Sequence, residues 1–197
     1  MRNGAPRLVL ASGSASRRRV LMNAGIAFES VVSDVEEHWT ARDDPAPTVA
    51  ALARRKAQAV APGRERDFVL GCDSLFVIDG RLLGKPGSVE EVVRRWGVMA
   101  GRSGALFTGH ALLHDGAVAE EVVSTEVAFS SLDAIEIAAY AQSEEAVDVA
   151  GGFTLEGRSS AFIDRIDGDA SNVLGLSVGA LRRLMRTFGV SISELWI

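Results

Sequence analysis

Residues 8–19 have the sequence LVLASGSASRRR, in which a short apolar run is followed by a loop of small residues and then by three arginines. The apolar run Leu8–Ala11 predicts a buried strand, and the pattern of Ser16–Ala24 predicts a helix. A small-residue loop between a strand and a helix presents backbone N–H groups and the positive end of the helix dipole to an anion. The stretch therefore predicts an anion-binding loop, although the same residue types also form ordinary surface turns.

The side chains of this loop suit a phosphate. Ser12 and Ser14 add hydroxyl donors, and the serine and glycine residues let the backbone approach a ligand closely. Arg17, Arg18 or Arg19 can add charge-assisted, bidentate contacts to phosphate oxygens. Basic side chains on a solvated helix face are the alternative interpretation of the arginines.

The composition is that of an ordinary folded globular protein. The chain has 197 residues, of which 47% are hydrophobic and 24% charged, so we expect one domain over residues 1–197. The net charge of −5 disfavours nucleic acid and anionic membranes as partners, and phosphate binding must then depend on a local basic pocket. The single cysteine, Cys72, excludes an internal disulfide and a multi-cysteine metal site.

The chain shows no pattern of a membrane span or a signal peptide. No apolar run approaches the roughly 18 residues that a membrane-spanning helix needs, and Leu8–Ala11 is too short for the core of a signal peptide. The lone cysteine also fits a reducing compartment. We therefore expect a cytoplasmic protein.

Strand and helix patterns alternate along the chain. Apolar runs predict further strands at Phe28–Val32, Phe68–Gly71, Leu75–Ile78, Leu82–Leu83, Ala105–Leu113, Val118–Phe129, Ala150–Leu155 and Ala161–Ile166. Capping residues and helical spacing predict helices at Val49–Ala61 after the N-cap Thr48, from Ser88 to about Met99, at Ala134–Gln142 and at Val178–Phe188. The polar stretch Ser33–Pro47 predicts a long surface loop. This order predicts an α/β fold, and its hairpins predict a mixed, twisted sheet flanked by helices.

The usual nucleotide-binding signatures are absent. The segment Gly80–Lys85 (GRLLGK) is one residue short of a Walker A loop, Pro86 follows in place of Ser or Thr, and no G-x-G-x-x-G occurs. The three histidines lack metal-ligand spacing, which favours structural roles. Cys72, on an apolar strand, is expected to be a small buried residue and not a nucleophile.

A set of charged residues fits the cleavage of a phosphoanhydride. Arg17, Lys56 and Lys85 can supply cations to phosphate oxygens. Asp73 follows a predicted buried strand, where open α/β sheets place ligand-handling groups. Asp73 and Glu37 can supply oxygen ligands for Mg²⁺ and a base for the attacking water. Each residue alone is more often an ordinary turn or surface residue, and the indication comes from the set.

Six segments occur in an order that closely resembles the Maf family of nucleoside triphosphate pyrophosphatases. They are LVLASGSASRRRVLMNAGIAFESVVSDVEE (8–37), LARRKAQAVA (52–61), VLGCDS (69–74), GRLLGKP (80–86), MAGRSGALFTGHALL (99–113) and AGGFTLEGRSSAFIDRIDGDASNVLGLSV (150–178). The resemblance spans roughly Leu8 to Leu184. It implies a mixed α/β fold similar to that of inosine-triphosphate pyrophosphatases, with two lobes around a cleft, and a homodimer.

The same resemblance implies an activity and a set of site residues. Members of the family cleave nucleoside triphosphates to the monophosphate and pyrophosphate with a divalent metal, Mg²⁺ or Mn²⁺. Matched by motif, the phosphate-binding loop comprises Ser12, Ser14 and Arg17. The catalytic residues implied are Asp73, Glu37, Lys56 and Lys85, of which Asp73 and Glu37 are also the implied metal ligands. Asp73 is the implied base or metal-assisting residue.

Two departures from the family pattern leave the preferred base open. The phosphate loop of the family has Pro and then a bulky residue where this chain has Ala15 and Ser16, and Ser16 fits neither the branch acting on dTTP and UTP nor the branch preferring 7-methyl-GTP. Glu156, the implied substrate-binding residue where the first branch has Gln, resembles the second branch. A carboxylate there can accept hydrogen bonds from a guanine-type N–H edge.

The leading hypothesis is a Mg²⁺-dependent pyrophosphatase that acts on modified or non-standard nucleoside triphosphates. The alternative is a nucleotide-binding regulator without significant turnover, because the family is linked by name to septum formation. A nucleotidyltransferase, whose fold also begins with a strand, a small-residue loop and an arginine, lacks its usual G-x-G loop here.

Overall fold

A computed structural model of the chain describes residues 7–197, so residues 1–6 of the expected domain lie outside it. The strands are β1 (Leu8–Ala11), β2 (Phe28–Val31), β3 (Phe68–Ile78), β4 (Arg81–Leu83), β5 (Ser103–His114), β6 (Ala117–Phe129) and β7 (Ile163–Asp167). The helices are α1 (Ala15–Asn23), α2 (Pro45–Val60), α3 (Val89–Met99), α4 (Ala134–Ala141), α5 (Ala170–Val173) and α6 (Val178–Thr187), with the 3-10 helices η1 (Ala150–Gly152), η2 (Arg158–Phe162) and η3 (Ile192–Leu195). None of the helices in this range is long and apolar enough to cross a membrane.

The strands form one mixed sheet in the order β2-β1-β3-β5-β6-β7, with β4 added to β3. β1 is parallel to both of its neighbours, whereas the other pairs are antiparallel. The long β5–β6 hairpin turns at Asp115 and Gly116, which both have positive φ, as a tight hairpin turn requires. The predicted α/β class with a mixed sheet flanked by helices is confirmed.

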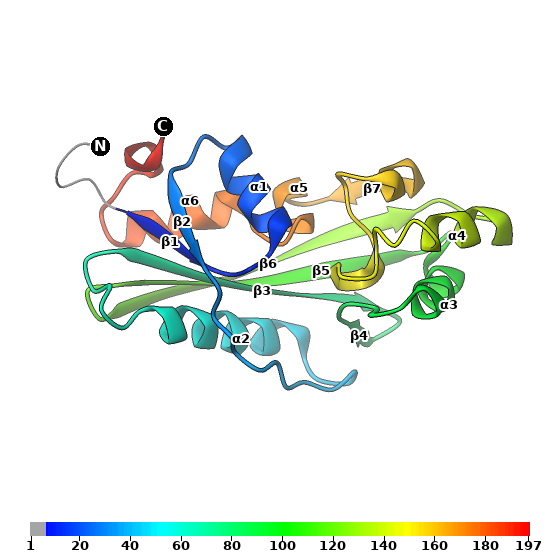
Figure 1. Cartoon of the computed structure of the whole chain (residues 1–197), viewed down its shortest axis with the longest axis horizontal. Coiled ribbons are helices and arrows are strands. Elements are labelled where there is room, and N and C mark those ends of the chain that lie inside the picture. Colours follow the sequence, from blue (N-terminus) through cyan, green and yellow to red (C-terminus); the bar gives the residue numbers. More distant parts are fainter. Residues whose placement is uncertain (1–6) are drawn as a thin grey trace.

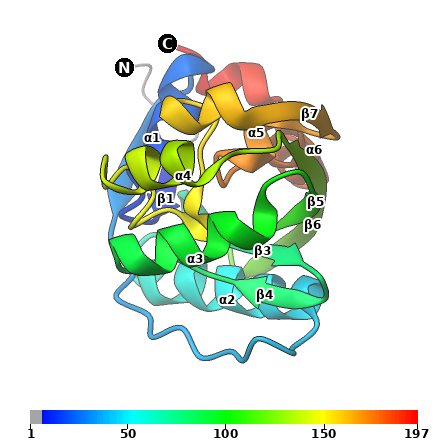
Figure 2. The same ribbon diagram turned by 90° about the vertical axis from the view of Figure 1, so that its right-hand side faces the viewer.

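Helices cover both faces of the sheet. α2 lies along one face, and α1 and α6 lie along the other (Figure 1). A second group of elements, which includes α3 and α4, packs at one end of the long strands (Figure 2). The apolar core follows this division, because Leu8, Leu70 and Leu181 belong to one cluster and Phe76 and Trp96 to another. The expected two lobes therefore share β3, β5 and β6.

Two glycines let α2 lie directly against the sheet. A Cβ atom on Gly71 would come within 2.1 Å of the carbonyl oxygen of Ala53, and one on Gly109 within 2.2 Å of that of Val49. These distances leave no room for any other residue type at either position. The close approach brings Lys56, on the inner face of α2, to the surface of the sheet.

The predicted start of the helix after Thr48 is wrong, because α2 begins at Pro45. The side chain of Asp44 accepts a hydrogen bond from the backbone N–H of Ala46 at 3.2 Å and is the N-cap. Pro45 suits the first helical position because that position needs no N–H donor. The loop expected before the helix is therefore shorter than predicted.

The predicted break between the strands Phe68–Gly71 and Leu75–Ile78 is also wrong. β3 is continuous, because its antiparallel pairing with β5 runs through this region and places Asp73 opposite Gly109. Asp73 therefore lies in the middle of a strand and not at its end.

The strand predicted at Ala150–Leu155 is absent, and β7 covers only part of the strand predicted at Ala161–Ile166. Gly151 and Gly152 both have φ of 77°, a left-handed conformation that is incompatible with a strand, and they lie in η1. Residues 158–162 form η2 before β7 begins.

Candidate functional site

The site lies where β1 ends and β3 continues. β1 pairs with β3 only as far as Leu10 opposite Leu70, so the edge of β3 beyond this point is open toward the loop that follows β1. Asp73 and Ser74 lie on this open edge, and consecutive strand residues point to opposite faces of a sheet. They therefore reach α2 on one side and α1 on the other. A cavity of about 820 Å³ contains both residues in its lining.

On the α1 side, the buried guanidinium of Arg17 is held by three hydrogen bonds. It donates from Nη2 to Oγ of Ser74 at 3.0 Å, from Nη1 to Oγ of Ser12 at 3.1 Å and from Nε to the carbonyl of Gly175 at 2.8 Å. Ser14 is the N-cap of α1 and accepts from the backbone N–H of Arg17 at 3.4 Å. The loop predicted to bind an anion is thus built around a fixed cation at the N-terminus of a helix.

Gly175 is a part of this arrangement that the sequence did not single out. Its φ is 89°, and a Cβ atom there would come within 3.3 Å of both Nε of Arg17 and Oγ of Ser74. It lies 158 residues after Arg17, so only the folded structure brings the two together. The sequence pointed to Asp73 but gave its neighbour Ser74 no role, and the contact of Ser74 with Arg17 is likewise visible only in the folded structure.

On the α2 side, the ammonium of Lys56 binds two carboxylates. Nζ donates to Oδ1 of Asp73 and, at 2.6 Å, to Oε1 of Glu37. The side chains of Lys56 and Asp73 are 9% and 5% exposed, whereas that of Glu37 is 47% exposed. Lys56 therefore connects a buried carboxylate with one that faces solvent.

The pKa values of the two carboxylates are shifted in opposite directions. Burial raises the pKa of Asp73 above its ordinary value, and the charges of Lys56 and Arg17 offset this only in part. Burial also acts to raise the pKa of Glu37, but the hydrogen bond from Lys56 and the charges of Lys56, Arg17 and Lys85 outweigh it, so that pKa is lowered. Burial thus shifts Asp73 toward its protonated form, whereas the neighbouring cations hold Glu37 in its ionised form.

One oxygen of Asp73 remains available to a ligand. Within the described residues, the buried atom Oδ2 has no hydrogen-bond partner, and such an atom is costly unless something binds it. The described residues include no group of three or more His, Cys, Asp or Glu that could hold a metal ion. Asp73 and Glu37 fit instead a Mg²⁺-like ion that takes one or two carboxylates and completes its shell with water and substrate phosphate.

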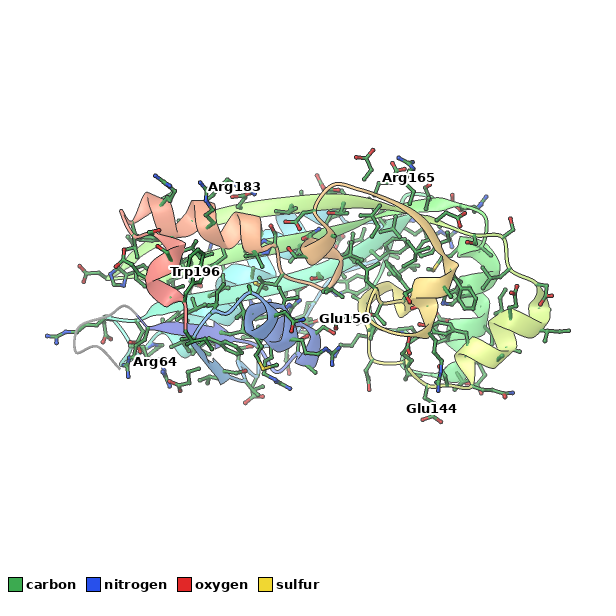
Figure 3. The ribbon with its side chains drawn as sticks, turned by 90° about the horizontal axis from the view of Figure 1, so that it is seen from above. Arg64, Glu144, Glu156, Arg165, Arg183 and Trp196 are labelled. Atoms are coloured by element: carbon green, nitrogen blue, oxygen red, sulfur yellow. The ribbon has the colours of Figure 1, made fainter. Side chains whose placement is uncertain are left out.

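All but one of the predicted site residues line the same cavity: Ser12, Ser14, Arg17, Glu37, Lys56, Asp73 and Lys85. Glu156 is outside the lining. Its Oε2 accepts a hydrogen bond at 2.7 Å from Nε of Arg19, which does line the cavity. Figure 3 shows Glu156 where α1 meets the segment between η1 and η2. The structure thus groups the expected phosphate and carboxylate residues and leaves Glu156 at the edge.

Of the residues expected to be structural, Cys72 and His110 are buried, whereas His38 is exposed on the surface and His114 is half-buried. Cys72 is fully buried, and burial raises the pKa of its thiol to about 12, so it is no nucleophile. His110 is also buried, with a backbone N–H donated to its ring.

The chain belongs to the Maf family. The family model described as "Maf-like protein" matches residues 7–188, which is nearly the whole chain. The chain is similar to proteins named "Nucleoside triphosphate pyrophosphatase" from Streptomyces coelicolor, Corynebacterium aurimucosum and Rippkaea orientalis. The first is 47% identical over 96% of this chain and 94% of that protein, the second 43% over 96% and 98%, and the third 42% over 97% and 94%.

Among solved structures, the chain is similar to the Staphylococcus aureus Ham1 protein. The TM-score is 0.37 and the sequence identity 12%, over 62% of this chain and 72% of that chain. The fold assignment rests on the sheet and on the family match.

Proposed function

We propose that this chain hydrolyses nucleoside triphosphates between the α and β phosphates, which gives a nucleoside monophosphate and pyrophosphate. The observation that carries the proposal is the Glu37–Lys56–Asp73 cluster at the open edge of β3, beside a loop that holds a buried arginine at a helix N-terminus. The names of the relatives, which match over nearly their whole length, support the same activity.

The cations of the site would bind and orient the triphosphate. Arg17 is held rigidly, so it can stabilise negative charge that develops on the phosphate oxygens without reorganising. Lys85 lines the cavity, and in the described part of the chain it forms no ion pair. Its ammonium is therefore available to the phosphates.

Asp73 would be the general base. A carboxylate whose pKa is raised by burial holds a proton more strongly than an exposed one, which favours proton transfer from water. Oδ2, the oxygen without a partner, would accept that proton, while Lys56 holds Oδ1 in place. The resulting hydroxide can attack the α phosphorus, and pyrophosphate is then the leaving group. If it attacks the β phosphorus, the nucleoside monophosphate is the leaving group.

A divalent cation, Mg²⁺ or Mn²⁺, is also part of the proposal. Glu37 would hold it directly and Asp73 would hold it through the water that gives its proton to Oδ2, and the chemistry of the ion would be to neutralise phosphate charge and polarise the reacting oxygens. Modified or non-standard nucleotides as substrates and a homodimeric state, both implied by the family resemblance, are proposed with it. A cytoplasmic location likewise stays a prediction.

The test is pyrophosphate release by the full chain from dTTP, UTP, CTP, GTP, 7-methyl-GTP and ITP, with Mg²⁺, with Mn²⁺ and with EDTA. ³¹P NMR of the products distinguishes cleavage between the α and β phosphates from loss of the terminal phosphate. We expect pyrophosphate, loss of turnover in EDTA and recovery when Mg²⁺ is restored. Turnover that survives EDTA would refute the metal requirement alone.

Asp73→Asn tests the base. It removes the basic oxygen while keeping the size of the side chain, and we expect turnover to fall at least about 1000-fold with circular dichroism unchanged. Asp79→Asn, the same chemical change in a surface turn, is the control and should leave turnover intact. A folded wild-type protein that binds nucleotides tightly and turns over none of them would favour the alternative hypothesis, a nucleotide-binding regulator without turnover.

A further inference from the structure

An ion pair connects the two sides of the cavity at its edge. Arg19 on α1 and Glu156 between η1 and η2 are 137 residues apart in the chain, and Nε of Arg19 donates to Oε2 of Glu156 at 2.7 Å. Nη2 of Arg19 also donates to Oγ of Ser16 at 3.3 Å. These two contacts fix the plane of the guanidinium, since both atoms on one edge of the group are engaged.

The opposite edge of the guanidinium remains available. Within residues 7–197, Nη1 of Arg19 donates no hydrogen bond, and Nη2 has a second N–H. Arg19 lines the cavity, whereas Glu156, the partner that holds it, does not. A ligand in the cavity therefore meets N–H donors at this point and not a carboxylate.

The position of Arg19 relative to Arg17 indicates which part of a nucleotide it meets. Arg17 is buried beneath the loop that would bind phosphate, while the side chain of Arg19 is 48% exposed. A nucleotide with its phosphates at Arg17 and Lys56 has its base farther out, toward the rim of the cavity. The charge of Arg19 is also balanced by Glu156, which makes it less suited to a phosphate and leaves its hydrogen-bond geometry for the base.

We infer that Arg19 is a specificity-determining residue, which donates from its free edge to a carbonyl oxygen of the nucleobase, and that Glu156 is the residue that positions it. This inference rests on the proposed function, because it assumes a nucleoside triphosphate in the cavity. The sequence predicted that the Glu156 carboxylate accepts hydrogen bonds from the base, whereas here the protein donates them through Arg19. A carboxylate would select bases that present N–H donors, whereas a guanidinium selects bases that present acceptors.

Two pairs of nucleotides isolate this difference. UTP and CTP differ at the C4 position, where uracil has a carbonyl oxygen and cytosine an amino group. ITP and ATP differ in the same way at C6. Arg19 should favour UTP over CTP and ITP over ATP by about tenfold in kcat/KM, since one charge-assisted hydrogen bond at a half-exposed site is at stake.

The experiment compares Arg19→Met, Glu156→Gln and Arg54→Met with the wild type. Met keeps the length of the side chain without its donors, so Arg19→Met should bring both ratios close to one. The amide oxygen introduced by Glu156→Gln can still accept from Nε of Arg19, so this variant should keep the preference for carbonyl bases. Arg54 forms an ion pair with Glu120 on the surface, with side chains exposed to nearly the same extent, 49% and 24% against 48% and 23%. Its substitution should change neither ratio.

Two results would overturn the inference. The first is a change of the ratios in Glu156→Gln with none in Arg19→Met, which would assign recognition to the carboxylate. The second is unchanged ratios in both variants. The same ratios are also measured as dissociation constants by calorimetry, with each substitution placed on the Asp73→Asn chain. A wild type without turnover would then refute the proposed function, while the binding ratios would still decide the role of Arg19.

Discussion

The backbone N–H of Ser177 donates a hydrogen bond to Nε2 of the buried His110 at 2.9 Å. The imidazole must be neutral to accept it, and its proton is then on Nδ1. Ser177 is the N-cap of α6 and ends the segment that contains Gly175, whose carbonyl holds Arg17. His110 thus supports, from the interior of the sheet, the segment that holds the guanidinium of Arg17.

The stability of the protein should therefore depend on the protonation of His110. Burial, together with the charge of Arg17, lowers the pKa of His110 from 6.5 to about 4. Because the unfolded chain binds this proton more readily, the stabilising contribution is complete above pH 6.5 and is lost as the pH falls from there through about 4. Between pH 7 and pH 5 the wild type should lose about 2 kcal/mol of unfolding free energy from this group.

The measurement is urea denaturation at both pH values, for the wild type and for His110→Gln. Glutamine can accept from Ser177 but does not titrate, so the variant should lose less stability on acidification by that amount. All other titrating groups are shared by the two proteins and cancel in the comparison. Equal losses in the two proteins would contradict the assigned pKa shift.

Lys56→Met should destabilise the fold by about 3 kcal/mol, because it leaves the buried carboxylate of Asp73 without its partner. Adding Asp73→Asn to this variant removes the unpaired charge and should recover part of the loss. Lys85→Met, at the exposed end of the site, should change the unfolding free energy by less than about 0.5 kcal/mol. Additive effects of the Lys56 and Asp73 substitutions would show that the two residues do not interact.

Gly109→Ala should cost about 3 kcal/mol and most of the activity, since its Cβ atom would overlap the backbone of α2 and displace Lys56. Gly97→Ala is the matched control. Gly97 is exposed in the last turn of α3, and a Cβ atom there meets nothing within 4 Å. It should stabilise the protein by about 1 kcal/mol, because glycine is a poor helix former. Thermal denaturation and pyrophosphate release measure both effects.

The sequence predicted the parts of the site that depend on local pattern. The strand and small-residue loop before Arg17 lead into the N-terminus of α1 as predicted, because strand, turn and helix signals follow one another within a few residues. Asp73 was identified for a reason that proved incorrect, since it lies in the middle of β3. The open edge that exposes it is the end of the neighbouring strand, β1.

The parts that the sequence missed depend on contacts between distant segments. The pairing of Arg19 with Glu156 and the support of Arg17 by Gly175 each join residues more than a hundred positions apart. The position of Glu156 in a motif indicated that it belongs to the site. The partner of its carboxylate, Arg19, is known only from the folded chain. No local pattern distinguishes a carboxylate that faces a ligand from one that holds an arginine.

The start of α2 provides a last prediction, in which sequence and structure disagree about one hydrogen bond. Asp44→Ala should lower the unfolding free energy by about 1 kcal/mol, because the Asp44 side chain caps α2. Thr48→Ala should change it by less than about 0.5 kcal/mol. The hydroxyl of Thr48 only donates to the carbonyl of Asp44 within the first turn, and alanine is the better helix former. Urea denaturation of the two variants shows whether Asp44 or Thr48 is the N-cap of α2. A larger loss in Thr48→Ala would mean that the helix begins after Thr48, and the loop that carries Glu37 would then be longer than the structure shows.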